Sequence, residues 1–226
     1  MKITWLGQGG FLFEKGDYKI VIDPYLSDNV VTVNPKNYRR VPVEEKFLNI
    51  KPDSILITHN HLDHYDPVTL DYYMKDTDKN VEFLGSYSSY NEARKYGGDH
   101  NYILVEPKTE WTLSCKVKVT AVKAYHSEIY AVGYILEDDS KKYYITGDTL
   151  YNEDIFELIP KDIYCLFLPV NGVGNNMNMV DAERFAEKVN AKYTVPMHFG
   201  LFDNLNPTEF KGNNVIIPEY FKEISF

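Results

Sequence analysis

The sequence predicts an α/β fold, in which short buried strands alternate with helices. The chain has 226 residues, a length at which single α/β domains with a sizeable core are common. Residues 54–58 form a short, β-branched and apolar run that is typical of a buried strand. Asp66 and Pro67 follow and fit the cap and the first position of a helix. We therefore expect one domain over residues 1–226, with a site at the carboxyl ends of its strands.

The remaining elements follow from the same signals, apolar runs for strands and capped amphipathic runs for helices. A glycine-rich turn at residues 7–10 predicts a hairpin between strands at 2–6 and 11–14, and the turn formers in residues 25–50 predict a long loop with one short helix. We assign the strands between residues 103 and 146 to a second sheet. Strands are expected at 20–22, 54–58, 81–84, 103–105, 111–122, 131–136, 142–146, 163–168 and 193–197, and helices at 67–75, 88–96, 152–158 and 180–189.

Composition narrows the class of partner. The net charge of −9 disfavours binding to a phosphate backbone, so no nucleic-acid partner is expected. Cys115 and Cys165 lie in apolar stretches and predict buried free thiols, as in a reducing cytoplasm. The first residues lack an export signal, and no apolar run is long enough to span a bilayer. We expect a cytoplasmic protein that does not bind membranes.

The segment His59-Asn60-His61-Leu62-Asp63-His64 contains three of the chain's six histidines. His59 and His61 alternate, so both rings leave an extended segment on the same side. Asp63 and His64 come after the chain begins to turn and can face a neighbouring point. Four candidate ligands divided into two pairs in this way favour two adjacent divalent ions over a polar loop with capping histidines.

Three more candidate ligands stand at or beyond the ends of predicted strands. His126 and Asp148 follow the strands that end near residues 122 and 146, and His198 follows the strand at 193–197. Each signal is weak alone, because most single residues at such positions form turns. Together they complete the ligand count that the first motif leaves open.

Other residues are candidates for supporting roles. Asp23 ends a predicted strand and is either a hydrogen-bond acceptor for a ligand imidazole or part of an ordinary turn, with equal weight. The polar loop at 171–176 precedes a helix, so Asn171 and Asn176 are candidate substrate contacts. A flexible connecting loop is an equally good interpretation of that segment.

These motifs, in this order, resemble the ligand set of the metallo-β-lactamase superfamily. Within it, residues 3–7, 131–134 and 190–192 are similar to the L-ascorbate-6-phosphate lactonase-like branch. The resemblance implies a four-layer αββα sandwich, with two mixed sheets, helices on the outer faces, and a dinuclear site between the sheets at one edge. It also implies the metal ligands: His59, His61 and His126 on one ion, Asp63, His64 and His198 on the other, and Asp148 bridging both.

Nitrogen and oxygen ligands of this kind suit zinc or manganese, so two such ions are the expected cofactors. Two ions that share a water convert it to hydroxide near neutral pH. We therefore expect a hydrolase that uses a metal-bridging hydroxide on a small, anionic, ester-like substrate, best a lactone of a phosphorylated sugar acid. Asp63 is the candidate catalytic residue, orienting the water or taking its proton. The alternatives are a phosphodiesterase acting on a small phosphodiester or nucleotide, and a non-catalytic protein that binds metal or ligand. The branch also implies a possible homo-oligomer.

Overall fold

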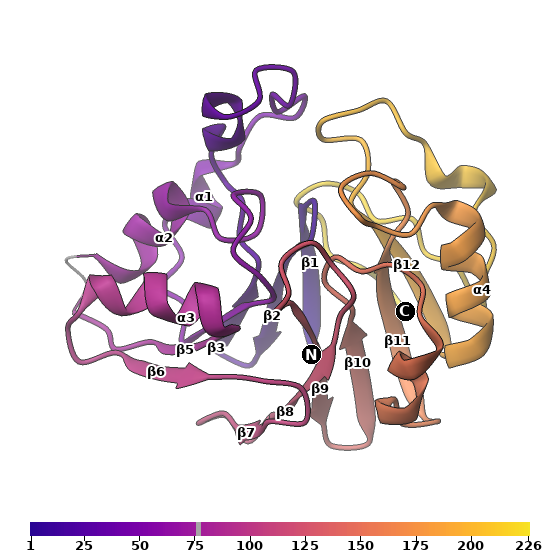
Figure 1. Ribbon diagram of the computed structural model, residues 1–226. Coiled ribbons are helices and arrows are strands. Elements are labelled where there is room, and N and C mark those ends of the chain that lie inside the picture. Colours follow the sequence, from indigo (N-terminus) through magenta and orange to yellow (C-terminus); the bar gives the residue numbers. More distant parts are fainter. Residues whose placement is uncertain (76–77) are drawn as a thin grey trace.

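Two six-stranded sheets lie face to face in the computed structural model, which describes residues 1–75 and 78–226 (Figure 1). The first sheet has the order β1-β2-β3-β4-β5-β6 and the second β12-β11-β10-β9-β8-β7. The strands are β1 (Lys2–Gly7), β2 (Gly10–Lys15), β3 (Tyr18–Ile22), β4 (Ser54–Ile57), β5 (Glu82–Gly85), β6 (Asn101–Leu104), β7 (Glu110–Thr112), β8 (Lys118–Lys123), β9 (Val132–Asp138), β10 (Lys141–Ile145), β11 (Ile163–Pro169) and β12 (Tyr193–Met197).

Helices cover the outer faces of both sheets, which confirms the predicted sandwich (Figure 1). On the first sheet lie α1 (Glu45–Leu48), α2 (Pro67–Met74) and α3 (Tyr87–Ala93), and on the second lies α4 (Met179–Val189). As predicted, Asp66 caps α2 by accepting a hydrogen bond from the amide of Val68. Short 3-10 turns complete the chain: η1 (Asn29–Thr32), η2 (Arg94–Tyr96), η3 (Glu153–Leu158) and η4 (Pro207–Glu209).

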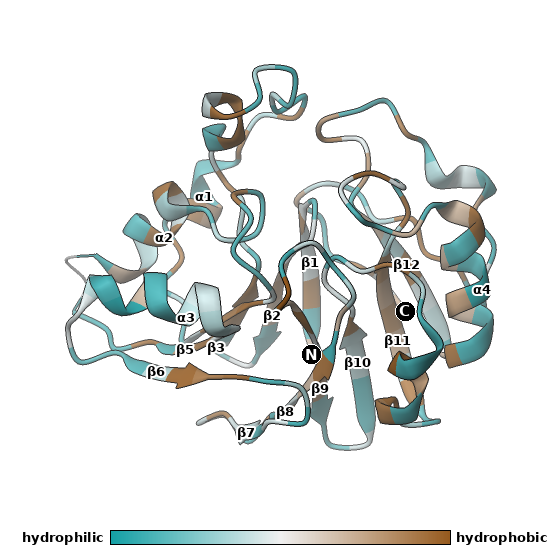
Figure 2. Ribbon diagram, viewed as in Figure 1, coloured by the Kyte–Doolittle hydropathy of each residue, from teal (hydrophilic) through white to brown (hydrophobic). Residues whose placement is uncertain are grey.

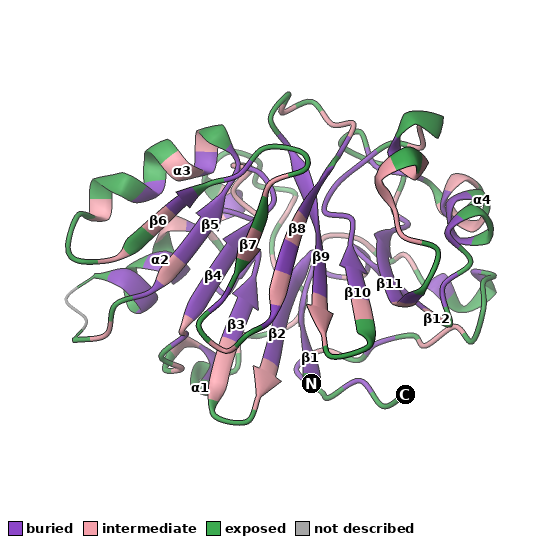
Figure 3. Cartoon of the chain, turned by 90° about the horizontal axis from the view of Figure 1, so that it is seen from below, coloured by how far each residue is buried: buried purple, intermediate pink, exposed green. Residues whose placement is uncertain are grey.

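The main core fills the space between the sheets, where the strands are largely buried (Figure 3). Phe11 of β2 meets Phe167 of β11 edge to face, with ring centroids 4.8 Å apart. A second core joins the outer face of the first sheet to its helices, where Ile55 and Ile57 pack with Leu70 of α2. In Figure 2, β11 is mostly brown, as expected of a strand that is buried on both faces and is therefore nearly continuously apolar.

The direction of the strands determines which of their ends lie together at one edge of the sandwich. β3 to β6 run parallel to one another, as do β10 to β12. Two antiparallel steps separate β1 from β3 and β8 from β10, so β1 and β8 run in the same direction as those strands. The carboxyl ends of these strands therefore lie along one edge of the sandwich.

Two strand predictions are wrong. β6 belongs to the first sheet rather than the second, because the crossover through α3 returns it to pair in parallel with β5. The single strand predicted at 111–122 is divided into β7 and β8 by a tight turn. Lys116 adopts a φ of +68° in that turn, and its amide donates to the carbonyl of Leu113. These two strands then pair with each other as a hairpin.

His100 is part-buried and links two elements. Its Nδ1 accepts a hydrogen bond from the amide of Val81 at 3.2 Å, and its Nε2 lies 3.0 Å from the carbonyl of Met74. This arrangement fixes the neutral tautomer with the proton on Nε2. His100 therefore has a structural role away from the other five histidines.

The segment 212–226 lies along an edge strand of each sheet. Val215 bridges to Thr194 of β12, and Glu223 bridges to Thr4 of β1. The amide of Ile224 donates to the carbonyl of Ile3 at 2.8 Å. Within residues 1–75 and 78–226, every helix is too short or too polar to cross a membrane.

Candidate metal centre

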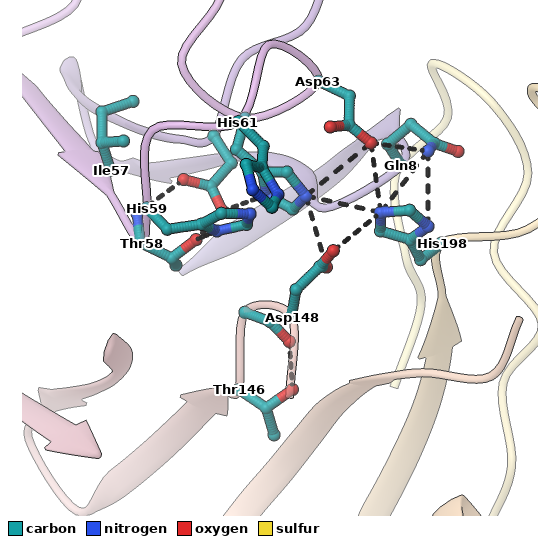
Figure 4. A network of polar contacts seen from close by, with 12 residues as sticks. Gln8, Ile57, Thr58, His59, His61, Asp63, Thr146, Asp148 and His198 are labelled. Atoms are coloured by element: carbon teal, nitrogen blue, oxygen red, sulfur yellow. Dashed lines mark hydrogen bonds and ion pairs between the residues drawn. The ribbon is translucent and has the colours of Figure 1, made fainter. Parts of the chain in front are cut away.

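Five histidines and two aspartates from four separate segments meet at the carboxyl edge of the sandwich. Figure 4 labels five of these residues, namely His59, His61, Asp63, Asp148 and His198. The loop after β4 supplies four of them, and the ends of β8, β10 and β12 supply one each. This is the complete set that the sequence predicts: His59, His61, Asp63, His64, His126, Asp148 and His198. Their ligand atoms form three groups whose members lie within 4.8 Å of one another.

The first group consists of His59, His61 and His126. The Nδ1 of His61 lies 3.0 Å from the Nε2 of His126. The ring of His59 lies against both, with centroid distances of 4.7 Å to His61 and 4.6 Å to His126. Three imidazoles thus surround one point, an arrangement suited to a divalent transition ion.

The second group consists of Asp63, His64 and His198. The Nε2 atoms of the two histidines lie 3.4 Å apart, and the Nε2 of His198 lies 3.3 Å from Oδ2 of Asp63. Asp148 stands beside both, with one oxygen 3.2 Å from His64 and the other 3.2 Å from His198. Asp148 also forms a third group with His59 and His64, so it lies between the two halves of the centre.

Two atoms of the centre show that the residues fit a cation. The Nε2 of His59 is buried without a hydrogen-bond partner among the described residues, and Oδ1 of Asp148 is buried with only the ion-pair contact to Nε2 of His64 at 3.2 Å. An unpaired polar atom in the interior is costly, and a bound ion would satisfy both atoms. The donor set of imidazole nitrogens and carboxylate oxygens, without a thiolate, suits zinc, manganese or iron.

Charge is distributed unevenly in the metal-free centre. Burial would lower the pKa of His198, but the carboxylates of Asp148 and Asp63 raise that pKa to about 9. Burial likewise opposes ionisation of His64, yet the nearby carboxylates, Asp148 first, raise its pKa well above the ordinary value. Burial and the charge of His64 hold the pKa of His59 well below its usual range. Metal binding must therefore displace protons from the His64–His198 half.

Asp23 lies behind the centre and accepts hydrogen bonds from it. Its Oδ2 lies 2.8 Å from Nδ1 of His64 and accepts the hydroxyl of Thr58 at 2.6 Å. Its Oδ1 accepts the amide of Thr58 at 2.8 Å. Asp23 is therefore an acceptor for a candidate ligand imidazole, the first of the two alternatives left by the sequence.

Asn171 and Asn176 reach the candidate ligands themselves. The carboxamide of Asn171 lies 3.0 Å from Nδ1 of His198, and Nδ2 of Asn176 donates to Oδ2 of Asp148 at 2.9 Å. Substrate contact by these residues stays a prediction.

Gln8 also contacts the centre, although no motif spacing in the sequence selects it. This residue follows β1, is 2% exposed and adopts a φ of +49°. Its Nε2 donates to Oδ2 of Asp63 at 3.1 Å and lies 3.3 Å from Nδ1 of His198 (Figure 4). One signal was available: Gln8 is the single polar residue in a glycine turn between two apolar strands, at a strand's carboxyl end.

Comparisons with known proteins agree with this geometry. A family model described as the beta-lactamase superfamily domain matches residues 2–198. A UPF0173 protein of Pyrococcus furiosus is 30% identical over 216 residues, covering 93% of this chain and 89% of the relative. A UPF0173 metal-dependent hydrolase of Methanopyrus kandleri is 31% identical over 229 residues, with 93% and 90% covered.

Among solved structures, Igni18, a metallo hydrolase from Ignicoccus hospitalis, has a TM-score of 0.77 at 22% identity. The match covers 100% of this chain and 97% of that chain, and at this identity it shows a shared fold. Family membership is shown by two other findings. The family model matches residues 2–198, and the two relatives are 30% and 31% identical with 93% of the chain covered. The chain therefore belongs to the metallo-β-lactamase superfamily, within the UPF0173 family of metal-dependent hydrolases.

Proposed function

We propose that the protein is a dinuclear metal-dependent hydrolase of a small ester-like substrate, best a lactone of a phosphorylated sugar acid. The observation that carries the hydrolase proposal is the convergence of all seven candidate ligands at one edge of the sandwich. In this proposal His59, His61 and His126 hold one divalent ion, and Asp63, His64 and His198 hold the other. Asp148 would contribute to holding both ions, as its position between the histidine groups supports.

Zinc or manganese bound there would supply Lewis acidity and a hydroxide at neutral pH. The protein contributes the placement of groups around the reacting water. Asp63 is held by hydrogen bonding from Gln8, and the charges of His64 and His198 lower the pKa of its carboxyl group against the effect of burial. As a candidate metal ligand, Asp63 would stay ionised in the loaded protein, so we assign it a role in orienting the water rather than in taking its proton.

The substrate class is supported by resemblance rather than by a contact. Residues 3–7, 131–134 and 190–192 resemble the L-ascorbate-6-phosphate lactonase-like branch. The phosphodiesterase alternative shares the same centre, because a hydroxide held by two ions can attack phosphorus as well as carbon. The two functions must therefore be separated by substrate.

The test is a substrate panel on the full chain, reconstituted separately with zinc and with manganese. The panel contains a sugar-acid lactone with and without a phosphate group, and bis-p-nitrophenyl phosphate. We expect ring opening of the phosphorylated lactone, abolished by a chelator and by His126→Ala. His100→Asn is the matched control, since it replaces the one histidine outside the centre and preserves an acceptor for Val81. Turnover of the phosphodiester alone would exclude the lactonase, and two bound ions without turnover would indicate a non-catalytic protein.

A further inference from the structure

We propose that the loop 171–178 is a single clamp that positions one ligand in each half of the metal centre and the carboxylate between them. The loop touches three candidate ligands from three different strands. Asn171 contacts His198, the carbonyl of Asn175 lies 3.3 Å from Nδ1 of His126, and Asn176 donates to Asp148. This inference rests on the metal centre proposed above, but not on the substrate.

The contact to His126 has the correct chemistry for a metal-bound imidazole. The Nε2 of His126 faces Nδ1 of His61 at 3.0 Å, so Nε2 is its ligand atom. A neutral imidazole that binds metal through Nε2 carries its proton on Nδ1. The carbonyl of Asn175 is a pure acceptor at that position, so the loop backbone selects this tautomer.

The contact to His198 demands one particular orientation of the Asn171 carboxamide. The Nε2 of His198 faces Asp63 and Asp148, at 3.3 and 3.2 Å, so this atom is the ligand and Nδ1 carries the proton. Asn171 presents Nδ2 to that Nδ1, while its Oδ1 is buried without a partner. A half-turn of the carboxamide pairs Oδ1 with the Nδ1 proton and satisfies both groups.

Gln8 cannot serve as that acceptor. Its Nε2 already faces Oδ2 of Asp63 at 3.1 Å, and an ionised carboxylate accepts only. The same Nε2 lies 3.3 Å from Nδ1 of His198. Asn171 is therefore the side chain that can accept from His198, and Gln8 fixes the neighbouring carboxylate.

The loop is held at its ends, so its three contacts act together. Asn171 bridges to Asn178, and the amide of Gly172 donates to the carbonyl of Met177 at 3.0 Å. The amide of Met177 donates to the carbonyl of Thr149, beside Asp148. The side chain of Asn178 accepts the amide of Asp181 and caps α4. A closed loop with these anchors holds its side chains more precisely than a free connection would.

The experiment measures zinc binding rather than hydrolysis. The metal-free full chain is titrated with zinc calorimetrically, as wild type, Asn171→Ala, Asn171→Asp and Val173→Ala. Val173 is 67% exposed on the same loop and is the matched control. We expect Asn171→Ala to weaken one of two zinc sites about 10–100-fold, because removal of the partner of a ligand histidine has that effect. Asn171→Asp keeps an acceptor and should restore binding, and Val173→Ala should bind as wild type.

A spectroscopic readout separates positioning from loop stability. In long-range proton–nitrogen spectra of the zinc-loaded wild type, His198 should carry its proton on Nδ1, and Asn171→Asp should preserve that signal. Wild-type affinity in Asn171→Ala, equal losses in Asn171→Ala and Asn171→Asp, or a proton on Nε2 of His198 would each overturn the clamp. A wild type that binds no zinc would overturn the metal centre itself, whereas zinc binding without lactone hydrolysis would leave the clamp standing.

Discussion

Oδ2 of Asp23 lies 2.8 Å from Nδ1 of His64, and both side chains are fully buried. The same oxygen accepts the hydroxyl of Thr58, whose Oγ1 lies 3.0 Å from Nδ1 of His59. Because that hydroxyl proton goes to Asp23, the Thr58 oxygen is free to accept from His59. One carboxylate therefore orients an imidazole in each half of the centre, directly for His64 and through Thr58 for His59.

Replacing this carboxylate should weaken both metal sites. Asp23→Asn keeps the shape of the side chain but puts a donor where one of three hydrogen bonds is now accepted. We expect the affinity for both zinc ions to fall about 10–100-fold, measured by competition with a chromophoric chelator. Asp17→Asn, an exposed carboxylate in the turn after β2, is the control. Unchanged affinity in Asp23→Asn would show that the contact does not orient the ligands.

The Thr58 hydroxyl connects Asp23 to His59, and we call this pair of hydrogen bonds the Thr58 relay. It predicts that a change at Thr58 weakens only the zinc site that contains His59. Thr58→Val preserves volume but removes the acceptor for Nδ1 of His59, whereas Thr58→Ser retains it. We expect Thr58→Val to weaken one zinc site about tenfold or more and Thr58→Ser to leave both close to wild type. Calorimetric titration resolves the two sites. Equal binding by the valine and serine variants would contradict the relay.

The turn between β1 and β2 approaches His64 so closely that only glycine fits. A Cβ built on Gly9 would lie 2.7 Å from Cε1 of His64 and 3.0 Å from its Nδ1. Gly9→Ala should therefore displace the His64 ring from Asp23 and reduce zinc affinity about tenfold or more. Circular dichroism checks that the variant folds. A folded Gly9→Ala with wild-type affinity would mean that the turn gives way instead of the ring.

Metal affinity should rise with pH. Carboxylates raise the pKa of His198 to about 9 and that of His64 well above its ordinary value, against the effect of burial. At neutral pH the ring of His198 is protonated in the metal-free protein, and the carboxylates also favour the protonated form of His64, so zinc or manganese bound in that half displaces protons. We expect apparent affinity to increase about tenfold or more per pH unit from pH 6 to 8. Flat affinity over this range would mean that the rings are already neutral.

Stability of the metal-free protein should change in the opposite direction. The folded-state pKa of His198, about 9, exceeds the unfolded value of 6.5. Its contribution is therefore fully present below pH 6.5 and is lost as the pH rises through about 9. Urea midpoints of chelator-treated protein should fall from pH 6 to 9. The zinc-loaded protein should become more stable relative to the metal-free protein as the pH rises, because zinc then binds more tightly. A urea midpoint of the metal-free protein that rises from pH 6 to 9 would contradict the raised pKa of His198.

The sequence was informative where ligands share a short motif or end a strand. The segment from His59 to His64 shows its own spacing, and His126, Asp148 and His198 each follow a recognisable apolar run. Strand direction then brings them together, because carboxyl ends of similarly directed strands share an edge.

The sequence was uninformative where the outcome depends on tertiary packing. Gln8 has no spacing signal, and its amide becomes relevant only when the β1–β2 turn meets Asp63 and His198. Propensity alone cannot assign β6 to a sheet, since that depends on the crossover through α3. The contact between Asn171 and His198 could not be predicted either, because local sequence does not encode where a loop side chain points; substrate contact by Asn171 stays a prediction.

The segment 212–226 has a consequence for how copies of the protein behave toward each other. It occupies backbone positions beside Thr4 and Thr194, on the outermost strand of each sheet. Exposed outermost strands would recruit a strand from a second molecule and begin stacking into fibres. The segment 212–226 thus covers part of one outermost strand of each sheet and leaves less of that backbone open to pairing with a second molecule.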